Sequence, residues 1–76
     1  MAIAPQDAVI ILRRREVEAR TGLSRSTIYE RMKQGTFPSP IALGPRSVGW
    51  VEAEIQAFLN DRIAARDSLV KTSVQV

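Results

Sequence analysis

The chain has 76 residues, of which 45% are hydrophobic and 25% charged, a composition typical of one small globular domain. It contains no cysteine and no histidine, which excludes a disulfide framework, thiolate chemistry, a Cys/His zinc site and imidazole acid–base catalysis. The net charge is +3, and the basic residues gather between residues 13 and 46, where eight of them stand against three acidic ones.

The first twenty residues predict a tail, a short extended segment and a helix. Residues 1–8 show no periodicity and contain a proline, so they are expected to form a flexible tail. Residues 9–12 form a β-branched run that predicts an edge strand or an extended lead-in. Residues 13–20 predict a short helix with Val17 in the core. Its first turn is expected to fray, because Arg13 stands where a polar N-cap residue would satisfy the free N–H groups.

A tight turn at Gly22 is expected to end this helix, since glycine takes positive φ at little cost. Ser24 is a good N-cap residue for a second helix over residues 25–34, which Gly35 ends. On a wheel of this second helix, Ile28 faces the core and the opposite half is polar. The segment therefore predicts two helices joined by a tight turn.

The next segment predicts a β-hairpin. Pro38 and Pro40 exclude a helix there. Residues 41–43 and 47–50 are expected to pair around a turn at residues 44–46, as a two-stranded ribbon that must lie against helices to be stable.

The last part of the chain predicts a closing helix. Residues 51–66 carry apolar side chains at a period of 3.6 and predict an amphipathic helix. Residues 67–76 lack this period, and we expect a flexible tail or an interaction strand there. The predicted folded domain is thus residues 9–66.

Two short helices joined by a glycine turn, a ribbon with a basic tip and a closing helix make a winged helix-turn-helix, a mainly α member of the α+β class. In such a unit the second helix enters the major groove of double-stranded DNA. The basic segment agrees with a nucleic-acid partner, although an ordinary solvated surface explains the charge equally well. The candidate DNA-binding residues lie at the start of the first helix, on the second helix and at the hairpin tip: Arg14, Arg15, Ser24, Arg25, Ser26, Thr27, Tyr29, Lys33, Arg46 and Ser47.

The basic candidates have distinct expected roles. Arg25 is placed to hydrogen-bond a guanine or a phosphate from the first turn of the second helix, and Lys33 to neutralise a phosphate. Arg46 fits a wing that contacts the backbone or the minor groove, or equally an ordinary turn residue. Arg14 and Arg15 are phosphate contacts or a solvated helix start.

Three segments between residues 12 and 63, "EV…TGLSRSTIY", "GTFPSPIALGPRSVGW" and "EAEIQAFL", resemble the AlpA-type phage and prophage regulators. These are small MerR-like winged-helix proteins related to excisionases. The resemblance implies a DNA-binding transcriptional regulator of a mobile genetic element, with its recognition helix over residues 24–33 and its wing over residues 44–47. It also implies an alternative, a recombination directionality factor that binds repeated sites and bends attachment-site DNA.

Other classes of function find less support in the sequence. The eight acidic residues show no paired or metal-ligand spacing and there is no Gly-rich phosphate loop, so we expect no enzyme, cofactor, metal or small-molecule ligand. No segment has the length of a membrane span and no signal peptide is recognisable, so we expect a cytoplasmic protein. One small unit makes few DNA contacts, which favours self-association on adjacent sites. A third alternative is a protein-interaction adaptor that uses the apolar residues Leu69, Val70, Val74 and Val76.

Overall fold

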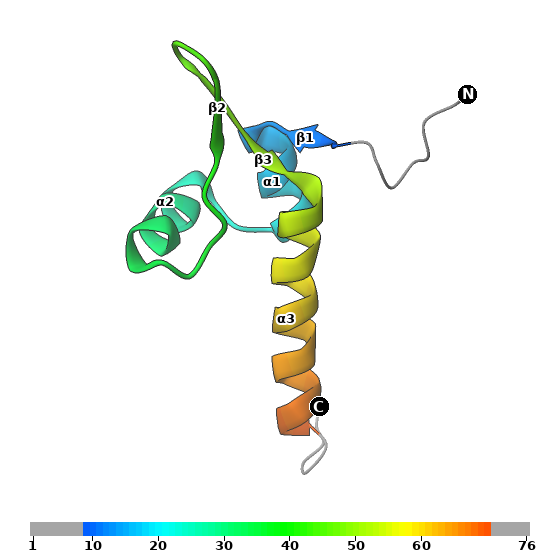
Figure 1. Cartoon of the computed structure of the whole chain (residues 1–76). Coiled ribbons are helices and arrows are strands. Elements are labelled where there is room, and N and C mark those ends of the chain that lie inside the picture. Colours follow the sequence, from blue (N-terminus) through cyan, green and yellow to red (C-terminus); the bar gives the residue numbers. More distant parts are fainter. Residues whose placement is uncertain (1–8, 71–76) are drawn as a thin grey trace, which may run out of the picture.

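The computed structural model describes residues 9–70, and the predicted tail of residues 1–8, like residues 71–76, lies outside the described residues (Figure 1). Helices and a small sheet alternate along the chain in the order β1 (Ile11–Leu12), α1 (Arg14–Thr21), α2 (Arg25–Gln34), β2 (Ile41–Gly44), β3 (Ser47–Val51) and α3 (Glu52–Val70). This mainly helical α+β architecture confirms the predicted fold class and is compatible with a winged helix-turn-helix.

The sheet is antiparallel with the order β1-β3-β2. The predicted hairpin is present, with β2 and β3 joined by a turn at residues 45–46. A third strand extends the predicted two-stranded ribbon, because Leu12 of β1 pairs with Trp50 on the other edge of β3. The N–H group of Glu52, the first residue of α3, donates to the Ile10 carbonyl oxygen at 2.8 Å. This hydrogen bond extends the pairing between β1 and β3 by one residue at the start of α3.

Gly49 lies where β1 and β2 approach each other over β3. A Cβ atom at this position would overlap Cγ2 of Ile11 and lie 3.1 Å from Cδ1 of Leu43. The absence of a side chain at Gly49 therefore leaves room for the Ile11 and Leu43 side chains of the flanking strands over the middle strand.

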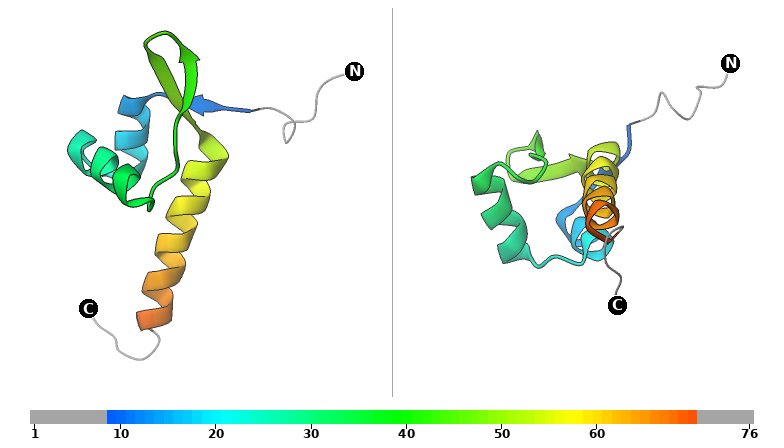
Figure 2. Two further views of the ribbon diagram at one scale, coloured as in Figure 1. Left: turned by 60° about the vertical axis from the view of Figure 1, so that its left-hand side comes forward. Right: turned by 90° about the horizontal axis from the view of Figure 1, so that it is seen from below.

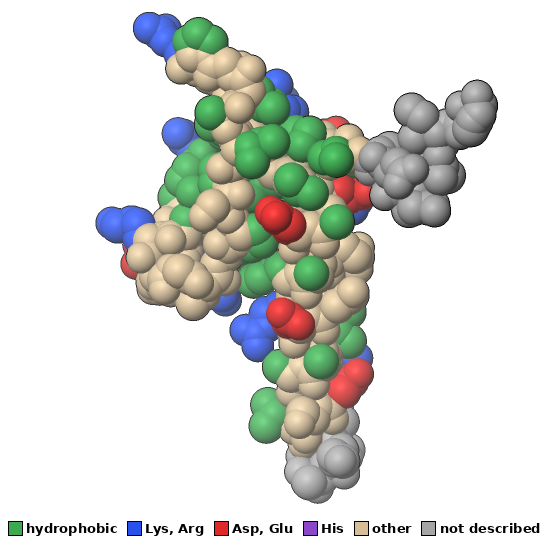
Figure 3. All heavy atoms as spheres, in the orientation of Figure 1, with side chains coloured by type: hydrophobic (Ala, Val, Ile, Leu, Met, Phe, Trp, Pro, Cys, Tyr) green, Lys and Arg blue, Asp and Glu red, His purple; other side chains and the backbone are tan. Residues whose placement is uncertain are grey.

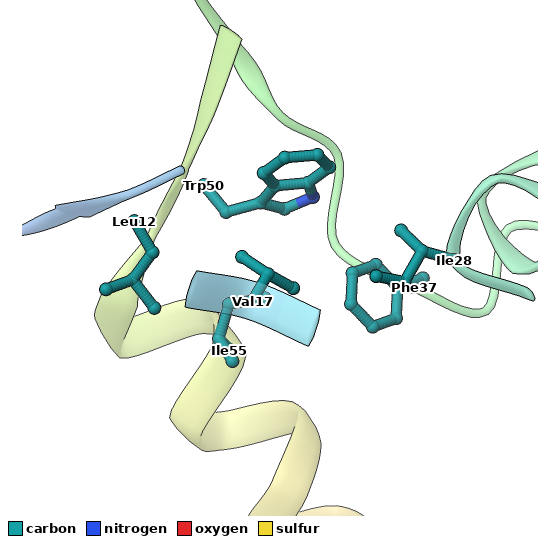
Figure 4. Close-up of a cluster of buried hydrophobic side chains, with 6 residues drawn as sticks. All are labelled: Leu12, Val17, Ile28, Phe37, Trp50 and Ile55. Carbon is teal, nitrogen blue, oxygen red and sulfur yellow. The ribbon is translucent and has the colours of Figure 1, made fainter. Parts of the chain in front are cut away.

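Six buried side chains form the core: Leu12, Val17, Ile28, Phe37, Trp50 and Ile55 (Figure 4). Each helix contributes one of them, so the core fixes the orientation of all three helices. The Trp50 indole N–H group donates to the Pro38 carbonyl oxygen at 3.0 Å, which ties the loop before β2 to the sheet. In that loop, the ring of Phe37 packs edge-on against Phe58 of α3 with centroids 4.8 Å apart.

The start of α1 is held by Arg13, where fraying was predicted. The arginine side chain has no acceptor and cannot cap the free N–H groups of the helix. Instead the Glu16 carboxylate accepts from the Arg13 N–H group at 2.7 Å, the return half of a capping box. The Arg13 Nε–H group donates to the Val48 carbonyl oxygen at 3.1 Å, which ties the start of α1 to β3. The structure therefore gives α1 a defined start.

Helix α3 runs to Val70, four residues beyond the predicted end at Arg66, so the prediction of a tail or a strand was wrong for residues 67–70. Its far half projects from the body, and Ile63 there is 47% exposed (Figures 1 and 2). A helix segment without an apolar period lacks packing against the core but keeps its backbone hydrogen bonds. Because no glycine or proline follows Val51 in the sequence, α3 can continue past Arg66.

Candidate nucleic-acid interface

Helix α2 has the predicted bounds because its ends are set by local residues. Gly22 adopts φ +74° and ends α1, and Gly35 adopts φ +77° and ends α2. Between them the Ser24 hydroxyl accepts from the Thr27 N–H group at 3.2 Å and caps the start of α2. Ile28 is fully buried. Its burial decides which side of the helix faces the core.

The other side of α2 is a polar face in contact with solvent. We call it the α2 outer face; it consists of the exposed residues Arg25, Ser26, Tyr29, Glu30 and Lys33. The Arg25 guanidinium carbon lies 5.7 Å from the centroid of the Tyr29 ring, a cation–π geometry that holds the guanidinium over the ring. A basic group is thereby presented in the first turn of the helix.

Two of the predicted contact residues are engaged in the helix start itself. The Ser24 hydroxyl donates to the Thr27 hydroxyl oxygen at 3.0 Å, and Thr27 is half-buried. Both side chains therefore hold the start of α2 in place, and their contact with DNA stays a prediction. Glu30, whose carboxylate accepts from the Gln34 amide at 3.3 Å, has a partner on its own helix.

A concavity of about 360 Å³ lies between the start of α1, helix α2 and the hairpin. We call it the arginine crevice; its lining residues are Arg13, Arg14, Arg15, Tyr29, Arg46 and Val48. Four of the predicted site residues, from three separate segments of the chain, thus line one surface. Arg14 is partly engaged, since its Nη1 lies 2.5 Å from Glu18 Oε2 within the same helix.

Arg13 and Val48 are the crevice residues that the predicted site did not include, and Arg13 is the basic one of the two. It was read only as an unfavourable N-cap residue, although it belongs to a run of three arginines. That run was the available signal, but which of its members reach the hairpin depends on the tertiary contact between Arg13 and Val48.

The hairpin projects from the body and carries a basic side chain at its tip (Figure 3). All of β2 is exposed, and the register between β2 and β3 shifts between Ala42 and Gly44 just before the turn. Arg46 in the turn is exposed and lines the crevice, whereas Ser47 is half-buried, pairs with Gly44 and does not line it. Of the two predicted hairpin residues, the structure groups Arg46 alone with the basic residues of α1.

The surface along α3 has a different character. A groove of about 690 Å³ between α3 and the loop before β2 combines aromatic and proline side chains with the carboxylates of Glu54 and Asp61. Acidic side chains are visible along α3 in Figure 3. Negative charge disfavours a phosphate backbone at this groove, so the arginine crevice and the α2 outer face define the candidate side.

Within residues 9–70, no three His, Cys, Asp or Glu side chains are grouped so that they could hold a metal ion. No helix of the same range combines the length and the apolar content that crossing a membrane requires.

Comparison with known proteins identifies one matching family model and two relatives. The model, described as prophage CP4-57 regulatory protein (AlpA), matches residues 10–63, which span every element from β1 to the first part of α3. Uncharacterized protein ORF88 of Enterobacteria phage P4 is 47% identical, and the alignment covers 72% of this chain and 62% of that protein. The DNA-binding transcriptional activator AlpA of Escherichia coli (strain K12) is 43% identical, with 75% of this chain and 90% of that protein covered. The chain therefore spans less than two thirds of the phage P4 relative.

Proposed function

The chain belongs to the AlpA family of prophage regulatory proteins, and we propose that it is a sequence-specific DNA-binding transcription regulator of a phage or mobile genetic element. The name of the Escherichia coli relative describes that protein as a DNA-binding transcriptional activator. The observation that carries the proposal is the arrangement of the α2 outer face beside the arginine crevice, to which Tyr29 belongs as well.

In the proposed complex, α2 lies in the major groove, which is wide enough to admit an α-helix. The α2 outer face then meets the base edges. Arg25 has the donors to hydrogen-bond guanine O6 and N7 from the first turn, and its stacking on Tyr29 limits the conformations that binding must freeze out. Lys33, in the last turn of α2, neutralises a backbone phosphate.

The hairpin and the start of α1, which line the arginine crevice together with Tyr29 of α2, contact the DNA backbone. Arg46 reaches a phosphate or the minor groove from the hairpin turn, and Arg14 and Arg15 reach phosphates from α1. These contacts set the position of the protein on the duplex, while the bases are read by α2.

One such unit covers few base pairs. Its DNA-binding surface consists of a single helix of 10 residues, one hairpin turn and one helix start. Single modules of this size bury roughly 600–1,000 Å² of protein surface on DNA. Tight binding therefore calls for adjacent sites occupied by several copies, which raises the effective concentration of each. The same requirement applies to a recombination directionality factor on repeated sites, the alternative function.

A binding selection from random duplexes, followed by footprinting at increasing salt, tests the proposal. We expect one preferred sequence, and an affinity that falls steeply as salt rises because counterions are released from the phosphates. Ser68→Ala, on the exposed far part of α3, serves as the matched control and should bind as the unaltered chain does. Absence of any complex at low ionic strength would leave only the adaptor hypothesis.

The position of the footprint in the genome then separates the two DNA-binding roles. A footprint confined to a promoter supports regulation. A footprint over several direct repeats inside an attachment site supports excision.

A further inference from the structure

We propose that the arginine crevice seats one phosphodiester group of the DNA backbone, and that this phosphate fixes the register of α2 in the major groove. The proposal rests on the proposed DNA-binding function and adds to it a single shared contact. Arg15 of α1 and Arg46 of the hairpin would grip the same phosphate instead of two separate ones.

The charges in the crevice point to an anion. Four guanidinium groups, each carrying a positive charge, line it. Two carboxylates lie beside them, Glu16 on the Arg13 N–H group and Glu18 on Arg14, so four positive charges against two negative ones leave a net charge of +2. Within residues 9–70, no hydrogen bond or ion pair engages the side chain of Arg15 or that of Arg46. Their charges are therefore available to a ligand.

The crevice is held in place before any ligand arrives. Arg13 donates its Nε–H to the Val48 carbonyl oxygen, which fixes the start of α1 against the strand that follows the hairpin turn. The Arg14 contact with Glu18 fixes a second guanidinium along α1. The Arg13 hydrogen bond thus sets the backbone of α1 and that of the hairpin relative to each other, so binding an anion between Arg15 and Arg46 has to order only their two side chains and not the segments that carry them.

A phosphodiester fits this set of donors. Guanidinium groups match phosphate oxygens in pairs of parallel hydrogen bonds, and the crevice volume of about 360 Å³ lies within the range of ligand sites. Two other concavities differ: the α3 groove carries Glu54 and Asp61, and a concavity along α2 is lined by both Arg31 and Glu30. Of these three concavities of the described residues, the arginine crevice has an excess of positive charge.

Tyr29 connects the crevice to base recognition. It lines the crevice, and its ring also lies under the Arg25 guanidinium at 5.7 Å. A phosphate in the crevice is therefore one side chain away from the residue assigned to read a base. Seating that phosphate would determine which base pair lies opposite Arg25.

A methylphosphonate scan tests the shared contact. Each phosphate of the selected duplex is replaced in turn by a neutral methylphosphonate, and affinity is measured for the unaltered chain and for Arg15→Gln, Arg46→Gln and the matched control Lys33→Gln. One replacement should weaken binding of the unaltered chain about tenfold, the loss expected for a charge-assisted hydrogen bond. That loss should largely vanish in both Arg15→Gln and Arg46→Gln and persist in Lys33→Gln, which lies outside the crevice.

The outcomes separate this proposal from the proposed function. If the two arginine variants lose sensitivity at two different phosphates, the shared seat is refuted while DNA binding stands. If the unaltered chain forms no complex with any duplex, both fail. A further outcome is that inorganic phosphate raises the unfolding free energy at matched ionic strength while no methylphosphonate replacement weakens DNA binding. That result would assign the crevice to a free anion and refute the proposal that it binds a DNA phosphate. Both arginines are exposed, so the variants should fold as the unaltered chain does, which circular dichroism checks.

Discussion

Replacing Ile28 by alanine tests which side of α2 packs in the core and which side is free to bind DNA. Ile28 is fully buried in a core of only six residues, where Val17 and Phe37 are fellow members. Removing the side chain beyond Cβ costs about 2–3 kcal/mol of transfer free energy, at about 0.8 kcal/mol for each buried methylene. The cavity left behind brings the expected total to between about 3 and 5 kcal/mol. A domain of this length has an unfolding free energy of about 4–11 kcal/mol, so the loss is a large part of its stability.

Urea denaturation followed by circular dichroism measures this effect. The midpoint of Ile28→Ala should fall while the slope of free energy against urea is unchanged. Ser26→Ala, on the exposed side of the same helix, is the control and should change the unfolding free energy by less than about 0.5 kcal/mol. An Ile28→Ala variant with unaltered stability that no longer bound DNA would place Ile28 on the interface and refute the assigned orientation of α2.

Four further substitutions test the turn, the sheet and the DNA contacts. Gly22→Ala should lower the unfolding free energy by about 1–2 kcal/mol through backbone strain alone, because the residue adopts φ +74° and open space surrounds it; an unchanged urea midpoint would contradict this. Gly49→Ala should cost about 1–3 kcal/mol by overpacking against Ile11, and full stability would show that β1 can move aside. Arg25→Ala should cost about 1–3 kcal/mol at the selected site with little loss on random DNA, whereas equal losses in an anisotropy titration would make Arg25 a phosphate contact. Lys33→Gln should weaken binding to all sequences and reduce the slope of log affinity against log salt by about one, so an unaltered slope would remove Lys33 from the interface.

Features set by neighbouring residues could be predicted from the sequence. Ser24 and Gly35 mark the ends of α2 because capping and left-handed glycine geometry depend on only a few adjacent residues. The position of Ile28 in the core follows from helical period, since one face of a helix of 10 residues must be buried. The hairpin turn could be placed for the same reason, because a proline and a glycine adjoin it.

Features set by distant contacts could not be predicted. From its neighbours in the sequence, Arg13 is predicted to be a poor N-cap residue. Its hydrogen bond to Val48, 35 residues away, shows that it fixes the start of α1. The grouping of Arg14 and Arg15 with Arg46 likewise depends on how the hairpin packs on α1. The end of α3 was misplaced because apolar period reports on packing, and the last turns of this helix have no core to pack against.

Substitution of single purines by 7-deazapurines in the selected duplex tests the docking of α2 most directly. The change removes the N7 acceptor from the major groove and leaves the minor groove and the phosphates as they were. We predict that a few adjacent substitutions weaken binding, and that at one of them the loss disappears in Arg25→Ala. If every 7-deazapurine duplex binds as tightly as the parent, α2 does not read the major groove and the proposed mode of binding is wrong.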